Sequence, residues 1–162
     1  MKSRYLCRGK RTDNGEWVEG FYFCMTHPDG GHMHHFIIPF GADLSLGTTI
    51  EKIQVEIDPS TICWCTGLED KNGILIWEND IIEKEFYSVA DSYANSKKYM
   101  GTIQYKNGGW YVNVVTDDIA QGYEHRIYLI EAIANSKDLE HFEIIGNSFD
   151  NPELLMEEEK EI

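Results

Sequence analysis

Proline, basic side chains and long apolar runs are all scarce in this sequence. Only four of its 162 residues are proline, and the composition is globular, with 42% hydrophobic and 26% charged residues. That composition excludes collagen-like or disordered chains. No segment approaches the ~18 apolar residues of a membrane span, and the N-terminal MKSRYLCRGKR lacks the apolar run of a secretory signal. We therefore expect a soluble cytoplasmic protein of the host cell, whose four cysteines are reduced thiols.

The shortage of basic residues sets the charge of the chain. There are 14 basic and 28 acidic side chains, a net charge of −14, so direct nucleic-acid binding is not expected. The basic residues are unevenly placed, because five lie among the first eleven residues, which hold no acid: Lys2, Arg4, Arg8, Lys10 and Arg11. Four of these have even numbers and would share one face of an extended strand. This cationic face is suited to an acidic surface of a second copy, although its charges could instead pair within the monomer or face water.

Short aromatic and β-branched runs alternate with Gly, Asn and Asp clusters, a pattern typical of an all-β protein. The pattern predicts strands at residues 5–9, 17–24, 37–40, 53–57, 61–65, 74–77, 81–85, 101–106, 109–115 and 142–146. It favours a loop over 88–98, a short helix over 127–135, and a terminal helix that begins at Asn151-Pro152 with Asn as the cap.

Two Asn-Gly pairs predict two-residue hairpin turns, since both residues tolerate positive φ angles. The Asn107-Gly108 turn pairs Lys106 with Gly109, which places Ile103 opposite Val112 on an apolar face. The Asn14-Gly15 turn would place Cys7 opposite Tyr22 and Lys10 opposite Glu19. Cys7 and Cys24 would then be diagonal neighbours, roughly 7–8 Å apart, so we expect no disulfide.

Several longer segments recur in a recognisable order. They are RGKRTDNGEWVEG at 8–20, DPST at 58–61, TGLEDKNG at 66–73, IWENDII at 76–82, IGN at 145–147 and DNPELL at 150–155. These segments resemble those of the YopX family of phage and prophage proteins. The resemblance implies a mainly β fold of twisted antiparallel strands, with a small SH3-like barrel portion and short C-terminal helical segments. It implies a phage or prophage origin, but no reaction and no catalytic residue.

The resemblance also bears on the domain organisation, and the sequence departs from the family pattern at two positions. The length of 162 residues suits one domain, or two small β lobes that share a core. We expect residues 1–156 to form a single YopX-like domain and 157–162 to form an acidic tail. Asn79 stands where the family usually has Gly before Asp; because Asn tolerates positive φ, the turn should survive. Ser148 replaces a usual apolar residue, which puts the packing of that edge in question.

The most prominent candidate metal ligands are His32, His34, Cys63 and Cys65. Zinc takes Cys and His ligands in a tetrahedron, and residues two apart on a strand share a face. The spacing nevertheless differs from the two-residue gap of common structural zinc sites. Buried thiols beside a polar histidine loop explain the same pattern.

Paired carboxylates can serve as acid and base or hold Mg²⁺, and four lie near one another in sequence: Glu69, Asp70, Glu78 and Asp80. Each also occupies a turn, where Asp accepts hydrogen bonds from nearby backbone N–H groups. Other motifs point to turns or core rather than to chemistry. Ser45 and Ser148 lie outside any Gly-x-Ser-x-Gly nucleophile elbow. No phosphate-binding Lys follows the glycine pairs Gly30-Gly31 and Gly108-Gly109. The tryptophans on predicted strands are typical core residues: Trp17, Trp64, Trp77 and Trp110.

We therefore assign no catalytic, cofactor-binding or metal residue. The sequence favours a non-enzymatic phage accessory protein that binds itself, as a homo-oligomer, or another host or phage protein. Two alternatives stay open. One is an acidic nucleic-acid mimic that acts on a host DNA-binding protein; the other is a metal-dependent enzyme that uses the His/Cys cluster.

Overall fold

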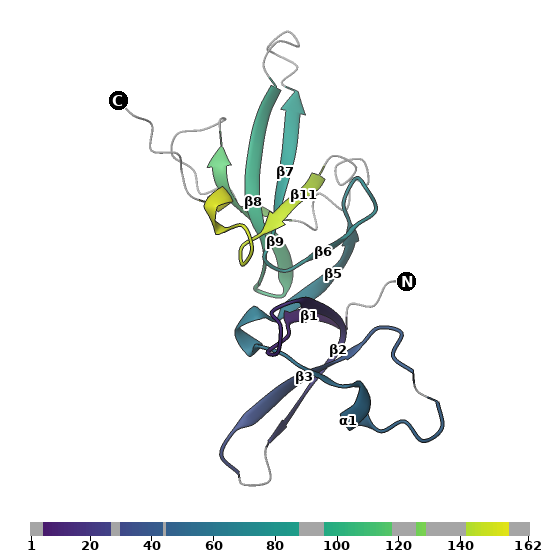
Figure 1. Ribbon diagram of the computed structural model, residues 1–162. Helices are drawn as coiled ribbons and strands as arrows, with labels where there is room; N and C mark the ends of the chain where they lie inside the picture. Colours follow the sequence, from purple (N-terminus) through teal and green to yellow (C-terminus); the bar gives the residue numbers. More distant parts are fainter. Residues whose placement is uncertain are drawn as a thin grey trace. The chain divides into compact units, whose positions relative to one another are not determined.

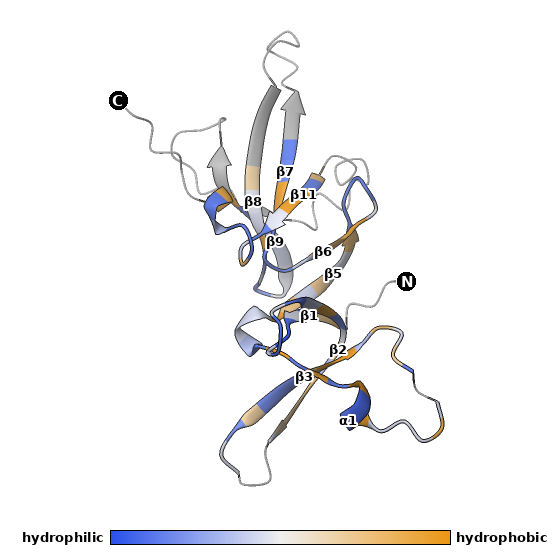
Figure 2. Ribbon diagram, in the orientation of Figure 1, coloured by the Kyte–Doolittle hydropathy of each residue, from blue (hydrophilic) through white to orange (hydrophobic). Residues whose placement is uncertain are grey.

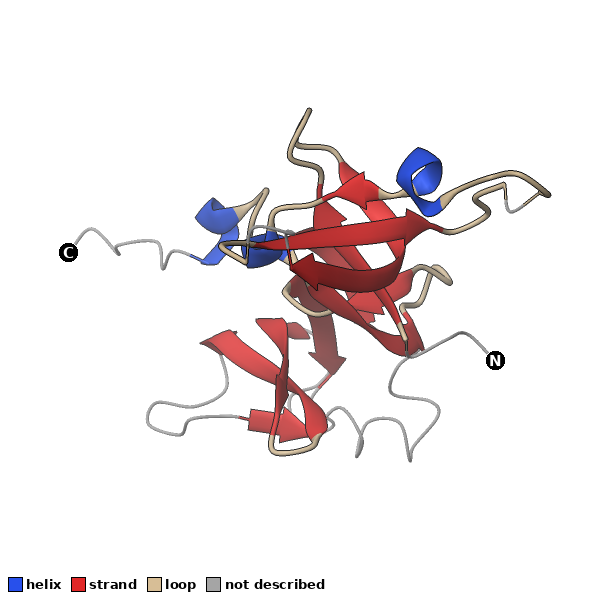
Figure 3. Cartoon of the chain, turned by 90° about the horizontal axis from the view of Figure 1, so that it is seen from below, coloured by secondary structure: helices blue, strands red, loops and turns tan. Residues whose placement is uncertain are grey.

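Antiparallel strands make up most of the structure, a computed structural model that describes residues 5–26, 30–43, 45–87, 96–117, 126–128 and 142–155. Figures 1 and 3 show that the helices in these ranges are short. The predicted mainly β fold is confirmed. The chain divides into two compact units, Met1–Gly67 and Leu68–Ile162.

The first unit is built on a curled sheet. Its elements are β1 (Leu6–Lys10), β2 (Trp17–Thr26), β3 (Met33–Pro39), α1 (Ile50–Ile53), β4 (Val55–Glu56), η1 (Pro59–Thr61) and the start of β5 (Cys63–Glu69). The strand order is β4-β3-β2-β1-β5-β6, with β6 (Leu75–Trp77) in the second unit.

The segment after β4 closes the curl into a half-barrel. On one side, the Ile57 N–H donates to the His35 carbonyl of β3 at 2.9 Å. On the other side, Ile57 forms an antiparallel bridge with Arg11, and the Asp58 N–H donates to the Lys10 carbonyl at 2.8 Å. The two outer strands of the three-strand run β3-β2-β1 are therefore joined through one short segment. This curled half-barrel corresponds to the small barrel portion that the family resemblance implied.

The inner face of this half-barrel carries the core of the first unit. Cys7, Ile37 and Ile57 are buried together, and Val18 and Tyr22 pack against them. Close curling needs a residue without a side chain at Gly20, because a Cβ there would lie 1.9 Å from the Ile38 carbonyl oxygen. Alternate residues of the same strands point to the opposite side, which we call the outer face.

The register of the first hairpin differs from the prediction. β1 and β2 are joined by a four-residue loop, in which the Arg11 N–H donates to the Glu16 carbonyl at 2.9 Å and only Gly15 has positive φ. Lys10 therefore pairs with Trp17, and Cys7 with Gly20. Side chains stabilise the longer loop, since Arg11 forms an ion pair with Asp13 and Asn14 Oδ1 accepts the Glu16 N–H at 3.0 Å.

Some predicted element boundaries were also wrong. The strand expected at 53–57 is a helical turn, α1, followed by the two-residue β4. The strand expected from Thr61 begins at Cys63, because Asp58 caps a 3₁₀ turn by accepting the Ser60 N–H at 2.9 Å. Residues 96–98, predicted as part of a loop, open strand β8, whereas 88–95 lie outside the described residues.

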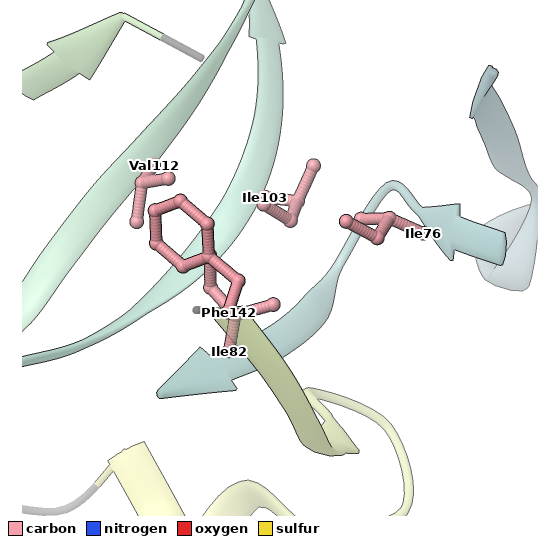
Figure 4. Close-up of a cluster of buried hydrophobic side chains, with 5 residues drawn as sticks. All are labelled: Ile76, Ile82, Ile103, Val112 and Phe142. Atoms are coloured by element: carbon pink, nitrogen blue, oxygen red, sulfur yellow. The ribbon is translucent and has the colours of Figure 1, made fainter. Parts of the chain in front are cut away.

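The second unit contains a five-stranded sheet ordered β10-β9-β8-β7-β11. Its elements are β6, β7 (Asp80–Tyr87), β8 (Ser96–Lys106), β9 (Gly109–Asp117), β10 (Arg126–Tyr128), β11 (Phe142–Asn147) and η3 (Pro152–Leu155). In Figure 2, a hydrophobic stretch of β7 is followed by a hydrophilic one. The neighbours Ile81 and Ile82 face opposite sides of the sheet and are both fully buried, so β7 is covered on both faces there. The core brings one buried side chain from each of five strands together (Figure 4): Ile76, Ile82, Ile103, Val112 and Phe142.

The β8–β9 hairpin has the predicted register, with Lys106 opposite Gly109 and Ile103 opposite Val112. Asn107 and Gly108 both have positive φ, 51° and 82°, as a two-residue turn requires. Ile103 and Val112 are fully buried, so the apolar face is confirmed. The opposite face is not simply solvated, because Thr102 is buried as well.

The two predicted helices near the C-terminus have different outcomes. Residues 127–128 belong to strand β10, which pairs with β9 because an Ile-Tyr pair suits a sheet; 129–135 lie outside the described residues. The terminal helix is a single 3₁₀ turn, η3, that starts at Pro152. Asn151 Oδ1 accepts the Asn147 N–H at 3.4 Å, so this side chain reaches back toward β11.

Candidate functional site

The four candidate zinc ligands do not come together. Cys63 and Cys65 are buried on β5, and the Cys63 thiol donates to the Thr61 carbonyl at 3.4 Å. His34 lies on β3, with Nδ1 2.7 Å from Glu56 Oε1. Because β1 and β2 lie between β3 and β5, these groups are three strand spacings apart, roughly 14 Å along the sheet. Within the described ranges, no three His, Cys, Asp or Glu side chains gather as metal ligands.

Two of the four candidate carboxylates hold turns together. The buried Asp80 accepts the Trp77 N–H at 2.8 Å, as predicted for an Asp after Asn79. The buried Asp70 accepts the N–H groups of Asn72, Ile74 and Ile144. Burial alone would raise the pKa of Asp70, but these backbone hydrogen bonds outweigh it and the pKa is lowered. Both carboxylates therefore stabilise local backbone.

The remaining sequence motifs lie in loops and turns, where they have structural roles. Ser45 forms hydrogen bonds within its own loop, where its N–H donates to Asp43 Oδ1 at 2.8 Å and its hydroxyl donates to Asp43 Oδ2 at 3.2 Å. The Ser148 N–H donates to the Asn79 carbonyl at 3.0 Å, and Asn79 has the positive φ of 65° that its turn requires. Gly30 lies in a bend with positive φ, and Gly108 in the β8–β9 turn. A small hollow of about 20 Å³ beside that turn offers little more than the room for one water molecule.

The tryptophans divide into core and surface residues. Trp77 is buried, and Trp110 packs against the core of the second unit, as predicted. Trp64 is 39% exposed, and Trp17 lies on the outer face of the first unit. Trp17 carries two cations over its ring, with Arg8 Cζ 4.7 Å and Lys10 Nζ 5.4 Å from the ring centroid. Such contacts stabilise by about 0.5–1 kcal/mol each at exposed sites.

The outer face of the first unit is unusually aromatic. Cross-strand pairs on it include Phe21 with Ile38, Phe23 with Phe36, and Met25 with His34. The Phe23 and Phe36 rings stack with centroids 5.4 Å apart, and His34 stacks on Phe36 at 6.1 Å. Phe21 and Met25 remain 47% and 45% exposed. A sheet face that is merely solvated carries polar side chains, so this face is suited to covering by another surface.

The outer face was not singled out from the sequence, although a signal was present. Residues 17–25, WVEGFYFCM, are apolar or aromatic at nearly every position, which indicates a strand with two apolar faces rather than one. On the inner face of the same ribbon, Tyr22 and His35 come together, with a distance of 2.7 Å between Tyr22 Oη and His35 Nδ1. That pairing depends on the β2–β3 register.

In the part of the chain that the structure describes, no helix combines the length and apolar character that crossing a membrane requires.

Fold and surface together define a mainly β protein with a curled half-barrel and an aromatic outer face. Residues 8–156 match the YopX protein family, so the chain belongs to the YopX family. The crystal structure of protein EF1440 from Enterococcus faecalis is similar to this chain, with a TM-score of 0.49 and 24% sequence identity, and the match covers 95% of this chain and 100% of that one. No curated protein matches the sequence.

Proposed function

We propose that this protein is a phage- or prophage-encoded accessory protein without enzymatic activity, which acts by binding and assembles first with copies of itself. The observation that carries the proposal is the outer face of the first unit. Phe21 and Met25 are about half exposed there, beside the stacked Phe23–Phe36 pair. Covering a face of this kind removes apolar surface from water, at about 25 cal/mol for each Å².

The charge distribution supports a second copy as the partner. Residues 1–67 hold six basic and eight acidic side chains, whereas 68–162 hold eight basic and twenty acidic ones. The cations Arg8 and Lys10 thus lie on the near-neutral unit, and another copy offers a strongly acidic one. Exposed ion pairs contribute only ~0–1 kcal/mol each, so the charges would orient the copies while the aromatic face supplies affinity. We expect closed symmetry rather than a filament.

The test is the molar mass measured by light scattering during gel filtration. The wild type should assemble, and the double variant Phe21→Ser/Met25→Ser should shift toward monomer at the same concentration. Tyr105→Ser is the matched control, since Tyr105 is 53% exposed but lies on the β8–β9 hairpin of the second unit. A wild type that is monomeric at all concentrations would contradict self-assembly.

Salt and charge reversal test the electrostatic part separately. Arg8→Glu should weaken assembly, and raising the salt from 0.05 to 1 M should weaken it in the wild type more than in the variant. The reason is that the screening length shrinks to about 3 Å at 1 M. Assembly that responds to neither change would show that the N-terminal cations play no part in it.

A further inference from the structure

A cysteine, a tyrosine and a histidine meet on the inner face of the β2–β3 ribbon. Cys24 on β2 is directly opposite His35 on β3, and side chains at such positions have Cβ atoms about 4.5–5.5 Å apart. Tyr22 lies two residues before Cys24, so it projects from the same face. Its hydroxyl is 2.7 Å from His35 Nδ1, and the two rings stack with centroids 5.9 Å apart.

The tyrosine hydroxyl connects the thiol with the imidazole. Burial raises the pKa of Tyr22, and so do the hydrogen bond between its hydroxyl and the Cys24 thiol and the negative charge that the thiolate would carry. Trp64 holds the phenol ring in place through an edge-to-face contact with centroids 5.8 Å apart. The Tyr22 hydroxyl therefore lies 2.7 Å from His35 Nδ1, and Cys24 projects from the same face of the ribbon, directly opposite His35.

Cys24 differs from the other three cysteines in its access to solvent. Cys24 is exposed, whereas Cys7, Cys63 and Cys65 are buried. Burial, assisted by the charge of Cys63, raises the pKa of Cys7 to about 12, which keeps that thiol protonated and inert. One thiol in the protein is thus open to reagents and has a potential proton acceptor beside it.

We propose that Cys24, Tyr22 and His35 form a reactive-thiol site that exchanges with low-molecular-weight disulfides. The Cys24 proton passes to the Tyr22 oxygen while the Tyr22 proton passes to His35 Nδ1. The thiolate then attacks one sulfur of the disulfide R–S–S–R, a Cys24–S–S–R bond forms, and the other half leaves as R–S⁻. The imidazolium returns its proton to the leaving thiolate through Tyr22, which gives R–SH. The disulfide supplies the oxidising equivalent, so no further reactant is needed.

The site is independent of the binding surface proposed above. Cys24 and His35 project from the inner face of the ribbon, while Met25 and His34 form the neighbouring pair on the outer face. A thiol adduct on Cys24 would therefore not cover Phe21 or Met25 directly.

The test measures the rate of thiol exchange in the full-length protein with 4,4′-dithiodipyridine. A neutral disulfide is chosen because the net charge of −14 would repel an anionic one. In native wild type, one thiol should react rapidly and peptide mass spectrometry should place the adduct on Cys24. Its rate at pH 7 should exceed that of the same cysteine in the urea-unfolded chain by at least ~10-fold, a modest effect for proton transfer by a positioned side chain.

Two substitutions should remove the acceleration, and a third should not. His35→Gln and Tyr22→Phe each break the relay, so the Cys24 rate should fall to that of the unfolded chain. His32→Gln is the matched control: His32 is an exposed histidine just before β3, and it lies outside the strand pairs that form the ribbon. Failure to fold would be visible in the same assay, because the three buried thiols would then react as well. Equal rates in wild type, His35→Gln and Tyr22→Phe, or a native rate no faster than the unfolded one, would overturn the proposal.

Discussion

Asp70 should be a principal stabilising residue of the second unit. It lies in the turn between β5 and β6 and is 6% exposed. Oδ1 accepts the N–H groups of Asn72 at 2.8 Å and Ile74 at 2.9 Å, and Oδ2 accepts the Ile144 N–H of β11 at 3.3 Å. The carboxylate thus joins a local turn to a strand that is more than seventy residues away in sequence.

The expected cost of Asp70→Ala follows from the donors that it leaves behind. A buried N–H that loses its acceptor costs about 1–3 kcal/mol. The Asn72 donor can turn to water, since Asn72 is exposed, whereas Ile144 lies on a strand and is partly buried. We expect a loss of about 2–4 kcal/mol in the free energy of unfolding. Asp70→Asn, which keeps one acceptor oxygen, should lose about 1–2 kcal/mol.

The pH dependence provides an independent check. The folded-state pKa of Asp70 is lowered below its ordinary value of 3.8. The stabilisation by its charge is therefore fully present above the unfolded pKa and is lost as the pH falls through the folded pKa. The difference in unfolding free energy between wild type and Asp70→Asn should be constant from pH 7 to about pH 5 and should shrink below about pH 4.

Urea unfolding followed by far-ultraviolet circular dichroism at pH 7, 5 and 3 measures these differences. Asp58→Ala is the matched control, because Asp58 also accepts a backbone N–H in a turn, that of Ser60 at 2.9 Å, but is exposed. Its loss should be about 0.5–1 kcal/mol, the lower range for a capping residue. The reasoning fails if Asp70→Ala costs no more than Asp58→Ala, or if the Asp70→Asn difference grows as the pH falls.

Three further substitutions test the fold. Gly20→Ala should lower the free energy of unfolding by more than ~3 kcal/mol, because the added Cβ would lie 1.9 Å from a backbone carbonyl oxygen. Gly15→Ala should lower it by only ~1–2 kcal/mol, because Gly15 lies in open space and only its φ of 74° disfavours alanine. The midpoints of urea unfolding measure both losses. Ile103→Ala should cost about 2–5 kcal/mol from a fully buried site, and Ile145→Ala, 36% exposed, about 1 kcal/mol or less in the same titration. Asn79→Gly should change the melting temperature little, whereas Asn79→Val should lower it, since φ of 65° disfavours β-branched residues by ~1–2 kcal/mol.

Local turn chemistry could be predicted from the sequence because it involves only neighbouring residues. The Asn107-Gly108 turn set the register of β8 and β9, and that register put Ile103 and Val112 on the buried face. Asn79 adopts the predicted positive φ, and Asp80 accepts a hydrogen bond from the nearby backbone as expected. In each case the interacting atoms lie within a few residues, so composition and order suffice.

Tertiary contacts decided the rest. Asn14-Gly15 fits a two-residue or a four-residue loop, and the half-barrel closure through Ile57 and Asp58 favours the longer one. A short helix was predicted over 127–135, but pairing with β9 makes residues 127–128 part of a strand. The sequence predicted His34 as a candidate metal ligand, whereas the β2–β3 register places His35 beside Cys24 and Tyr22. Neighbouring residues on a strand face opposite sides, so only the register, which depends on contacts far apart in the chain, determines which histidine meets the thiol.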